Sequence, residues 1–302
     1  MYADDRKEAG QMGKRAERIC FLGKNGIGKS VIVSNLSEAL CRQGHRVLQI
    51  GNDLSLSSTL LLLQNADIPP VLKALREQYA VDLRQFIAQS DCGVYCMELG
   101  GVTPGAGCMA RGIGMADELL ESQGVLEELG IDYVLYDISG EIPCTGYMLP
   151  IRDNIMDQCI IMTTGSYSSL FTANNLMTGI LYARRNRAIP IRLLVNYADR
   201  YPARPLLENY GKQVGVEVIG YLDFDQEVEN AVLAGTTIFE RCPCKKIAEQ
   251  FMEISRRVIQ TGPEATPVPL DGEEMRSWAR GWKNLELAQQ GGSRNREYSG
   301  NT

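Results

Sequence analysis

The sequence is poor in histidine and lacks a net positive charge, a long apolar run and a secretion signal. A single histidine, His45, stands among 302 residues, which argues against Ser-His-Asp triads and against metal sites built from several histidines. The 31 Lys and Arg residues are outnumbered by 37 Asp and Glu, and the formal charge of −6 argues against nucleic acid as the main partner. No run of about 18 apolar residues occurs, so we expect no membrane-spanning helix.

The first residues are polar and mixed in charge, without the apolar stretch of a signal peptide. We therefore expect a cytoplasmic protein. Its nine cysteines are an odd number, and the cytoplasm keeps thiols reduced, so a disulfide framework explains them poorly. Ligation of a metal or cluster by some of them, with burial of the rest, is the better interpretation.

The order of apolar segments predicts an α/β fold. Residues 18–22 are typical of a buried strand, a glycine-rich turn follows, and residues 29–42 carry apolar side chains near helical spacing. A second apolar strand is predicted over residues 47–50. Strand, glycine turn, helix and strand within about 35 residues form a βαβ unit, which implies a parallel sheet.

The alternation continues, and we predict one P-loop NTPase domain over residues 18–261 with a mostly parallel sheet flanked by helices. Further strands are predicted over residues 133–137, 159–162, 191–195 and 216–221, with a helix over 170–185. The glycine-rich stretch Gly93–Gly114 is interpreted as a long functional loop. Residues 1–17 are predicted to be a flexible extension, and residues 262–302 a linker, a terminal helix over 273–287 and a disordered tail.

The turn after the first strand fits the phosphate-binding pattern G-x-x-x-x-G-K-[ST]. It consists of Gly23, Lys24, Asn25, Gly26, Ile27, Gly28, Lys29 and Ser30. The motif lies between a predicted strand and a predicted helix, which is the context that it requires. Backbone N–H groups would face the phosphates, Lys29 would reach the β and γ phosphates, and the Ser30 hydroxyl would ligate Mg²⁺. A plain glycine turn before a helix is the weaker alternative.

Two carboxylates end predicted strands near this motif. Asp53 follows the second strand and Asp137 closes the strand at 133–137. In an open α/β sheet ligands bind at the carboxyl ends of the strands, so both are candidates for the water shell of the magnesium ion. Service as helix N-caps is the alternative for each.

Two cysteines lie in glycine-bearing loops. Cys108 follows Gly101-Val-Thr-Pro-Gly-Ala-Gly, and Cys144 closes Tyr136-Asp-Ile-Ser-Gly-Glu-Ile-Pro. Two cysteines of one chain cannot supply the four thiolates of a [4Fe–4S] cluster, whereas two chains related by a two-fold axis can. Spacing alone leaves burial as the alternative for either cysteine.

These motifs together resemble the nitrogenase iron protein family, which includes the L subunits of light-independent protochlorophyllide reductases and the reductase of a nickel-tetrapyrrole pathway. Lys24, directly after the first glycine, resembles the deviant Walker A motif that this family shares with the MinD/ParA ATPases. The resemblance covers residues 19–259 and rests on GG-x-x-PG-x-GC-x-x-RG at Gly100–Gly112, on YD-x-x-G-x-x-x-C at Tyr136–Cys144 and on MLPIRDN at Met148–Asn154.

The resemblance implies an ATP-dependent electron carrier that uses MgATP. A homodimer would hold one [4Fe–4S] cluster through Cys108 and Cys144 of each chain, and Lys24 would reach the nucleotide of the partner chain. Electrons would come from a ferredoxin or flavodoxin and pass to a heteromeric, nitrogenase-like catalytic protein. Asn196 matches a residue that contacts adenine, and Arg111 matches a docking-face arginine that is ADP-ribosylated in some members.

The chain also departs from that family. The segment Leu54–Thr59 lacks the lysine and aspartate that usually follow Asp53, and Glu141 stands where an aspartate is usual, in a catalytic switch segment. Val31 replaces a common threonine. These departures favour a nitrogenase-like system over a nitrogenase partner in the strict sense.

Two other functions stay open at this point: a non-redox positioning ATPase of the MinD/ParA type, and a scaffold for cluster assembly. Trp278 and Trp282, four residues apart, would pack on the body or a partner, or less favourably anchor a membrane helix. Burial is the favoured interpretation for the cysteines outside the two loops, although Cys92-x₃-Cys96 and Cys242-Pro-Cys244 have metal-binding potential.

Overall fold

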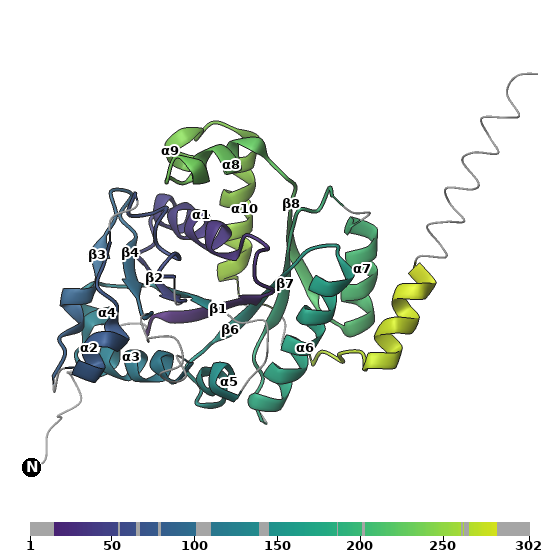
Figure 1. The fold of residues 1–302 in the computed structure, drawn as a ribbon, viewed down its shortest axis with the longest axis horizontal. Helices are drawn as coiled ribbons and strands as arrows, with labels where there is room; N and C mark the ends of the chain where they lie inside the picture. The colour runs from purple at the N-terminus through teal and green to yellow at the C-terminus, as the bar shows by residue number, and fades with distance from the viewer. Residues whose placement is uncertain are drawn as a thin grey trace, which may run out of the picture.

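The computed structural model describes residues 15–53, 55–64, 67–77, 80–100, 110–138, 145–185, 187–200, 203–260, 262 and 266–282. Within them the chain forms an eight-stranded sheet in the order β3-β4-β2-β5-β1-β6-β7-β8, flanked by helices on both faces (Figure 1). Every neighbouring pair is parallel except β3 and β4 at one edge. The predicted fold class, an α/β P-loop domain with a mostly parallel sheet, is confirmed.

The strands are short, and all except the edge strands β3 and β8 are almost wholly buried, as expected for a sheet covered on both faces. Their bounds are β1 Glu17–Gly23, β2 Val47–Asn52, β3 Ala88–Gln89, β4 Tyr95–Glu98, β5 Tyr133–Ile138, β6 Gln158–Thr163, β7 Ile191–Asn196 and β8 Glu217–Leu222. β1 lies between β5 and β6, so the turn that follows it opens near the middle of the sheet.

The helices divide between the two faces of the sheet and enclose two separate apolar clusters. One cluster lies under α1 (Lys29–Arg42), α9 (Ile238–Arg241) and α10 (Lys246–Ile259), with α8 (Gln226–Leu233) beside them. The other cluster lies under α2 (Val71–Glu77), η1 (Leu83–Phe86), α3 (Ala110–Ser122), α4 (Val125–Glu128), α5 (Thr145–Arg152), α6 (Tyr167–Ala183) and α7 (Ala203–Val214). Alternate residues of β1 enter alternate clusters: Ile19 and Phe21 enter the first, Cys20 and Leu22 the second.

The interpretation of Gly93–Gly114 as one long loop was wrong at both ends. The segment contains the whole of β4, whose Cys96 and Met97 are fully buried, and the first residues of α3. The glycines concealed a four-residue strand, because a window that short holds too few apolar positions to show a period. Residues 101–109 lie outside the described part of the chain.

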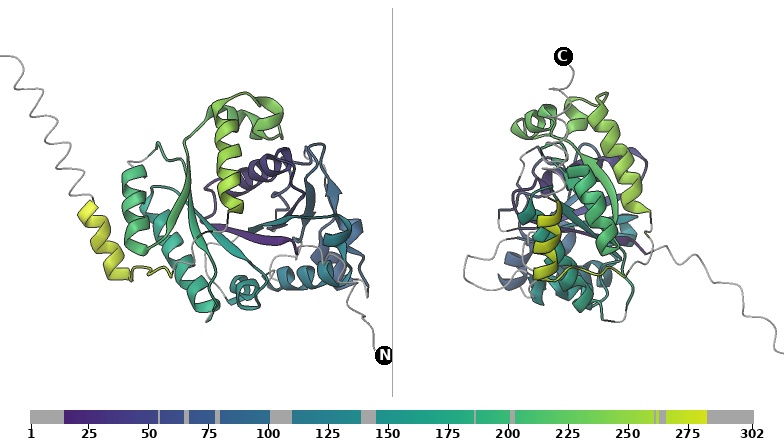
Figure 2. Two further views of the ribbon diagram at one scale, coloured as in Figure 1. Left: turned by 180° about the vertical axis from the view of Figure 1, so that it is seen from behind. Right: turned by 90° about the vertical axis from the view of Figure 1, so that its right-hand side faces the viewer.

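The C-terminal segment packs on the body of the domain through its helix over residues 272–282 (Figure 2). Met275 is fully buried, and the Trp278 indole N–H donates to Asn209 of α7 over 2.9 Å. The side chain of Asn174 on α6 fastens the preceding residues, because it both donates to the Leu270 carbonyl and accepts from the Leu270 N–H. Of the three alternatives for the tryptophans, Trp278 therefore follows the first, packing on the body of the domain.

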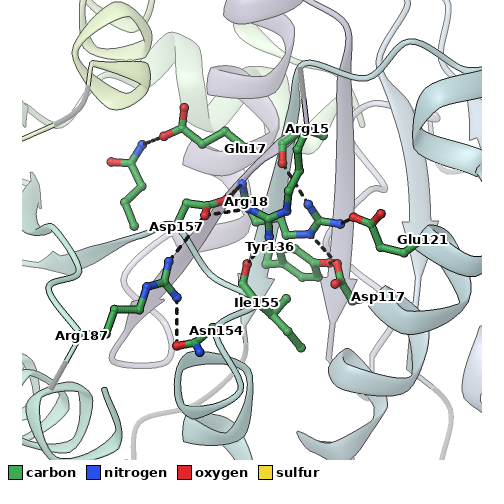
Figure 3. A network of polar contacts seen from close by, with 12 residues as sticks. Arg15, Glu17, Arg18, Asp117, Glu121, Tyr136, Asn154, Ile155, Asp157 and Arg187 are labelled. Carbon is green, nitrogen blue, oxygen red and sulfur yellow. Dashed lines mark hydrogen bonds and ion pairs between the residues drawn. The ribbon is translucent and has the colours of Figure 1, made fainter. Parts of the chain in front are cut away.

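A buried ion-pair network joins α3 to the sheet (Figure 3). The guanidinium of Arg18 on β1 is fully buried, and its Nε donates to Asp117 on α3 over 2.6 Å. A second nitrogen of Arg18 pairs with Glu121, and the Tyr136 hydroxyl donates to Asp117 over 2.8 Å. Burial lowers the pKa of Arg18, but the ion pairs more than offset that effect and raise it overall, so the guanidinium is charged.

Candidate functional site

The turn between β1 and α1 has the backbone conformation of a phosphate-binding loop. Gly28 precedes α1 with φ 85°, and a Cβ there would lie 2.9 Å from the side-chain amide nitrogen of Asn196. Both the left-handed backbone conformation and the lack of room for a side chain therefore favour glycine. No acidic residue occupies the first turn of α1. The N–H groups of that turn therefore carry no acidic side chain of their own helix beside them, which suits a phosphate group.

Lys29 and Asp137 face each other at the floor of this loop. Both side chains are buried, and Lys29 Nζ lies 3.9 Å from Asp137 Oδ1, too far for a hydrogen bond. That carboxylate oxygen has no hydrogen-bond partner in the described structure. Because buried carboxylates are normally hydrogen-bonded, Asp137 fits a site completed by a hydrated cation.

A cavity of about 320 Å³ brings these residues together with Asp53. Its lining comprises Asn25, Gly26, Gly28, Lys29, Ser30, Val31, Asp53 and Asp137. The cavity thus combines the groups that a Mg²⁺-nucleoside triphosphate requires. Lys29 and the helix N-terminus suit the phosphates, and the Ser30 hydroxyl and the two carboxylates suit the hydrated Mg²⁺. The residues present thus fit MgATP.

Asp53 is held by the residues that follow it. Ser55 Oγ donates to Asp53 Oδ2 over 2.5 Å, and Ser57 Oγ approaches the same oxygen at 3.5 Å. Serines thus stand here in place of the charged residues that usually follow this aspartate in the family that the chain resembles. Their hydroxyls contact the same carboxylate that would bind a water of a hydrated Mg²⁺.

A further carboxyl group, Glu98, lies beside this cavity and was missed by the sequence analysis. It ends β4, and β2 places Gly51 in register with Glu98 on one side and Asp137 on the other. A Cβ on Gly51 would lie 2.0 Å from Glu98 Oε2, so the carboxyl reaches across Gly51 toward Asp137. The rule that selected Asp53 and Asp137, a carboxylate at a strand end, would have found it had β4 been recognised.

Burial, with the nearby charges of Asp137 and Asp53, raises the pKa of Glu98 from 4.5 to about 7, although two hydrogen bonds from Thr59 act in the opposite direction. The folded state therefore holds a proton that the unfolded state has lost between these two pH values. The free energy of unfolding should consequently fall by about 2–3 kcal/mol from this group as the pH rises from about 4.5 to about 7.

Glu98→Gln is expected to remove this decrease in the free energy of unfolding with rising pH in the nucleotide-free protein. Urea unfolding at pH 5 and pH 8 measures the free energy of unfolding, and Glu253→Gln, at an exposed glutamate, is the matched control. An identical pH dependence for wild type and Glu98→Gln would contradict the assignment.

A second cavity, of about 290 Å³, continues from the loop toward α8 and α10. Its walls are mostly apolar and include Val31, Ile32, Leu222, Val228, Val232, Ile247 and Phe251. Asn196 stands at its entrance, where its amide donates to the Ile27 carbonyl over 2.7 Å. Tyr197 also lines this cavity, and the Arg200 guanidinium lies 4.5 Å from the ring centre of Tyr197 and 4.4 Å from that of Phe224. A flat heterocyclic base fits such a pocket.

Lys24 lines neither of these two cavities, although Gly26 of the same loop lines both. It is half-buried and lines a separate hollow of about 240 Å³, together with Asn25, Gly26, Ile27, Thr164, Ser166, Ser168, Tyr197 and Arg200. Its ammonium group is thus not part of the cavity that contains Lys29, although the two lysines belong to one loop.

Four residues of interest lie outside the described structure or have no described side chain. Cys108, Glu141 and Cys144 fall in undescribed segments, and the side chain of Arg111 is not described. Among the described residues no group of three or more histidine, cysteine or acidic side chains is arranged to hold a metal. Cys20, Cys96 and Cys159 are fully buried, as predicted. The prediction of burial was wrong for Cys41, Cys92 and Cys242, which are partly exposed, and for Cys244, which is exposed.

The fold and this loop define the class: a P-loop ATPase with the deviant Walker A arrangement on a mostly parallel sheet. Comparison with known protein families identifies the particular family within this class. Residues 17–283 match the model of the 4Fe-4S iron sulfur cluster binding proteins, NifH/frxC family. The chain belongs to this family, and the resemblance inferred from its motifs is confirmed.

Curated relatives match along nearly their whole length. The chain is 35% identical over 272 residues to "Nitrogenase iron protein 2" of Paenibacillus durus, covering 90% of this chain and 93% of the relative. It is 34% identical over 264 residues to the protein of the same name from Methanothermobacter thermautotrophicus, covering 87% and 97%.

Solved structures agree on the fold alone. MinD of Aquifex aeolicus superimposes with a TM-score of 0.63 at 18% identity, covering 85% of this chain and all of that one. MinD of Pyrococcus horikoshii, complexed with Mg-ADP, gives 0.63 at 21% identity, covering 83% and 99%. Within the described residues no helix is long and apolar enough to cross a membrane.

Proposed function

We propose that this protein is an ATP-dependent electron-transfer reductase of the nitrogenase-like kind. The observation that carries the proposal is the position of Asp137. Its carboxylate is buried beside Lys29 in the nucleotide cavity, with Oδ1 lacking a hydrogen-bond partner, and Cys144 follows seven residues later in the chain. A change at the nucleotide therefore has a short covalent path to one of the two proposed cluster cysteines.

In this function MgATP binds in the loop cavity. Lys29 and the N–H groups of the α1 N-terminus hold the phosphates, and Ser30 with the waters bound by Asp53 and Asp137 holds Mg²⁺. The base enters the apolar pocket beside Asn196, which supports the adenine contact implied by the family resemblance. Lys24 lies outside the cavity of its own chain, a position compatible with service to the nucleotide of a partner chain.

A homodimer would hold one [4Fe–4S] cluster through Cys108 and Cys144 of each chain, and the cluster supplies the low-potential electron. ATP binding and hydrolysis would select between two arrangements of the dimer, only one of which docks on the electron acceptor. We infer that Arg111 lies on that docking face and that Glu141, within the segment between Asp137 and Cys144, tunes the coupling.

The electron would come from a ferredoxin or flavodoxin and pass to a heteromeric catalytic protein related to nitrogenase. The serine-rich segment after Asp53, with Glu141 in place of the usual aspartate, favours a nitrogenase-like acceptor. The alternative of a MinD/ParA-type positioning ATPase is supported by the shared fold and by Lys24 of the deviant Walker A motif, both of which the reductase family has as well.

Cysteine replacement tests the proposal directly. Anaerobically purified wild type should contain about four irons per two chains, and Cys108→Ala or Cys144→Ala should contain almost none. Cys244→Ala, at an exposed cysteine, is the control and should keep the iron. Full iron in either loop variant, or iron-free wild type after anaerobic reconstitution, would refute the reductase; an iron-free ATPase is what the positioning function predicts.

A further inference from the structure

The segment that follows Asp53 is fastened to the end of β4 by one carboxyl group. Glu98 Oε1 accepts two hydrogen bonds from Thr59, one from the backbone N–H and one from the hydroxyl, each 2.9 Å long. Glu98 is 1% exposed and Thr59 2% exposed, so water does not replace these bonds easily. The other carboxylate oxygen, Oε2, is buried without a hydrogen-bond partner. Thr59 is therefore the anchor of this carboxyl group.

The same two segments touch a second time, two residues further along. A Cβ on Gly100 would lie 1.9 Å from the Leu56 side chain and 3.0 Å from the Asp53 carbonyl, so the backbone at Gly100 packs directly against both. Leu99 in turn donates to the Gly51 carbonyl over 2.8 Å. The end of β4 is thus enclosed between β2 and the segment after Asp53.

Nucleotide binding would act on this segment, because Asp53 lines the cavity proposed to hold MgATP. A hydrated Mg²⁺ bound there would compete with the hydroxyls of Ser55 and Ser57 for the Asp53 carboxylate. A change in these bonds would shift the residues between Asp53 and Thr59. Those residues contact the end of β4 at Glu98, through Thr59, and at Gly100, through Leu56.

We propose that Glu98 is a positioning residue that carries the nucleotide-dependent movement of residues 55–59 to the end of β4, from which the chain leads to Cys108 ten residues later. This route is separate from the path through Asp137 to Cys144, so each cluster cysteine has its own connection to the nucleotide. The inference rests on the proposed function only for its final link to the cluster.

The contacts can be removed one at a time. Thr59→Val keeps the shape and the backbone donor but loses the hydroxyl, and Glu98→Met loses the acceptor while filling the buried space. Glu98→Gln keeps an acceptor oxygen and should retain more of the coupling than Glu98→Met. Thr178→Val on α6 is the matched control, since its hydroxyl donates only to the carbonyl of its own helix.

Two measurements follow the movement. Hydrogen exchange with and without MgATP reports on residues 55–59 and on residues 98–100 independently of any cluster. The rate at which a chelator removes iron, with and without MgATP, reports on the cluster. We expect Thr59→Val and Glu98→Met to lower the MgATP effect at 98–100 and on chelation by roughly tenfold, with the effect at 55–59 and ATP affinity retained.

The outcomes separate the two proposals. An undiminished MgATP effect at residues 98–100 in both variants overturns the role of Glu98, whatever the protein's iron content. Loss of stability without loss of that effect would assign Glu98 a purely structural role and overturns it too. An iron-free wild type whose exchange at 98–100 still responds through Glu98 would sink the reductase proposal and leave the positioning role standing.

Discussion

Lys29→Met is expected to lower ATP turnover by about 10²–10³-fold, the loss seen when one preorganised charge-stabilising group is removed from an enzyme site. The lysine is 8% exposed at the floor of the cavity, where its charge acts in a medium that excludes most water. ATP binding should weaken as well, because the phosphates lose their nearest buried cation. A nucleotide titration followed by a steady-state hydrolysis assay measures both effects.

This replacement also leaves the Asp137 carboxylate buried without its ion-pair partner, so the free energy of unfolding should fall. Asp137→Asn in the same chain removes the unpaired charge and should restore part of that stability without restoring turnover. Lys212→Met, at an exposed lysine on α7, is the control. Near-normal hydrolysis by Lys29→Met would contradict the assignment of this loop as the ATP site.

The parts of the molecule that the sequence analysis predicted well are those with a local cause. The helix over 29–42 has the predicted bounds because a glycine in the left-handed region precedes it and its apolar residues keep one spacing. The helix predicted over 170–185 begins earlier, at Tyr167, because Ser166 caps it by accepting from the Ser169 N–H. The P-loop was likewise readable, since its conformation depends on residues within eight positions.

The parts that were missed depend on distant segments. The base pocket joins the P-loop to Val228 and Val232 of α8 and Phe251 of α10, about 200 residues away in the sequence. Glu98 becomes significant only when β2 places Gly51 between it and Asp137. No single window of the sequence contains either arrangement, and the placement of Cys108, Glu141 and Cys144 stays a prediction.

Arg18→Met is expected to destabilise the protein by about 3–5 kcal/mol, the usual cost of removing one partner from a buried ion pair. The guanidinium is fully buried, and its donors satisfy Asp117, the Ala16 carbonyl and Glu121. Asp117 is 6% exposed, and without Arg18 its carboxylate would keep only the hydrogen bond from Tyr136. Urea unfolding followed by circular dichroism measures the change.

The expected loss of stability comes from the Asp117 carboxylate, which stays buried without a countercharge, and a double replacement isolates this contribution. Arg18→Met with Asp117→Leu removes both buried charges and should be markedly more stable than Arg18→Met alone. The exposed pair of Arg257 and Glu217, 2.8 Å apart, supplies the control, because Arg257→Met should cost no more than about 1 kcal/mol. A loss below that value for Arg18→Met would mean that α3, which begins two residues after Cys108 in the sequence, does not depend on this network for its attachment to the sheet.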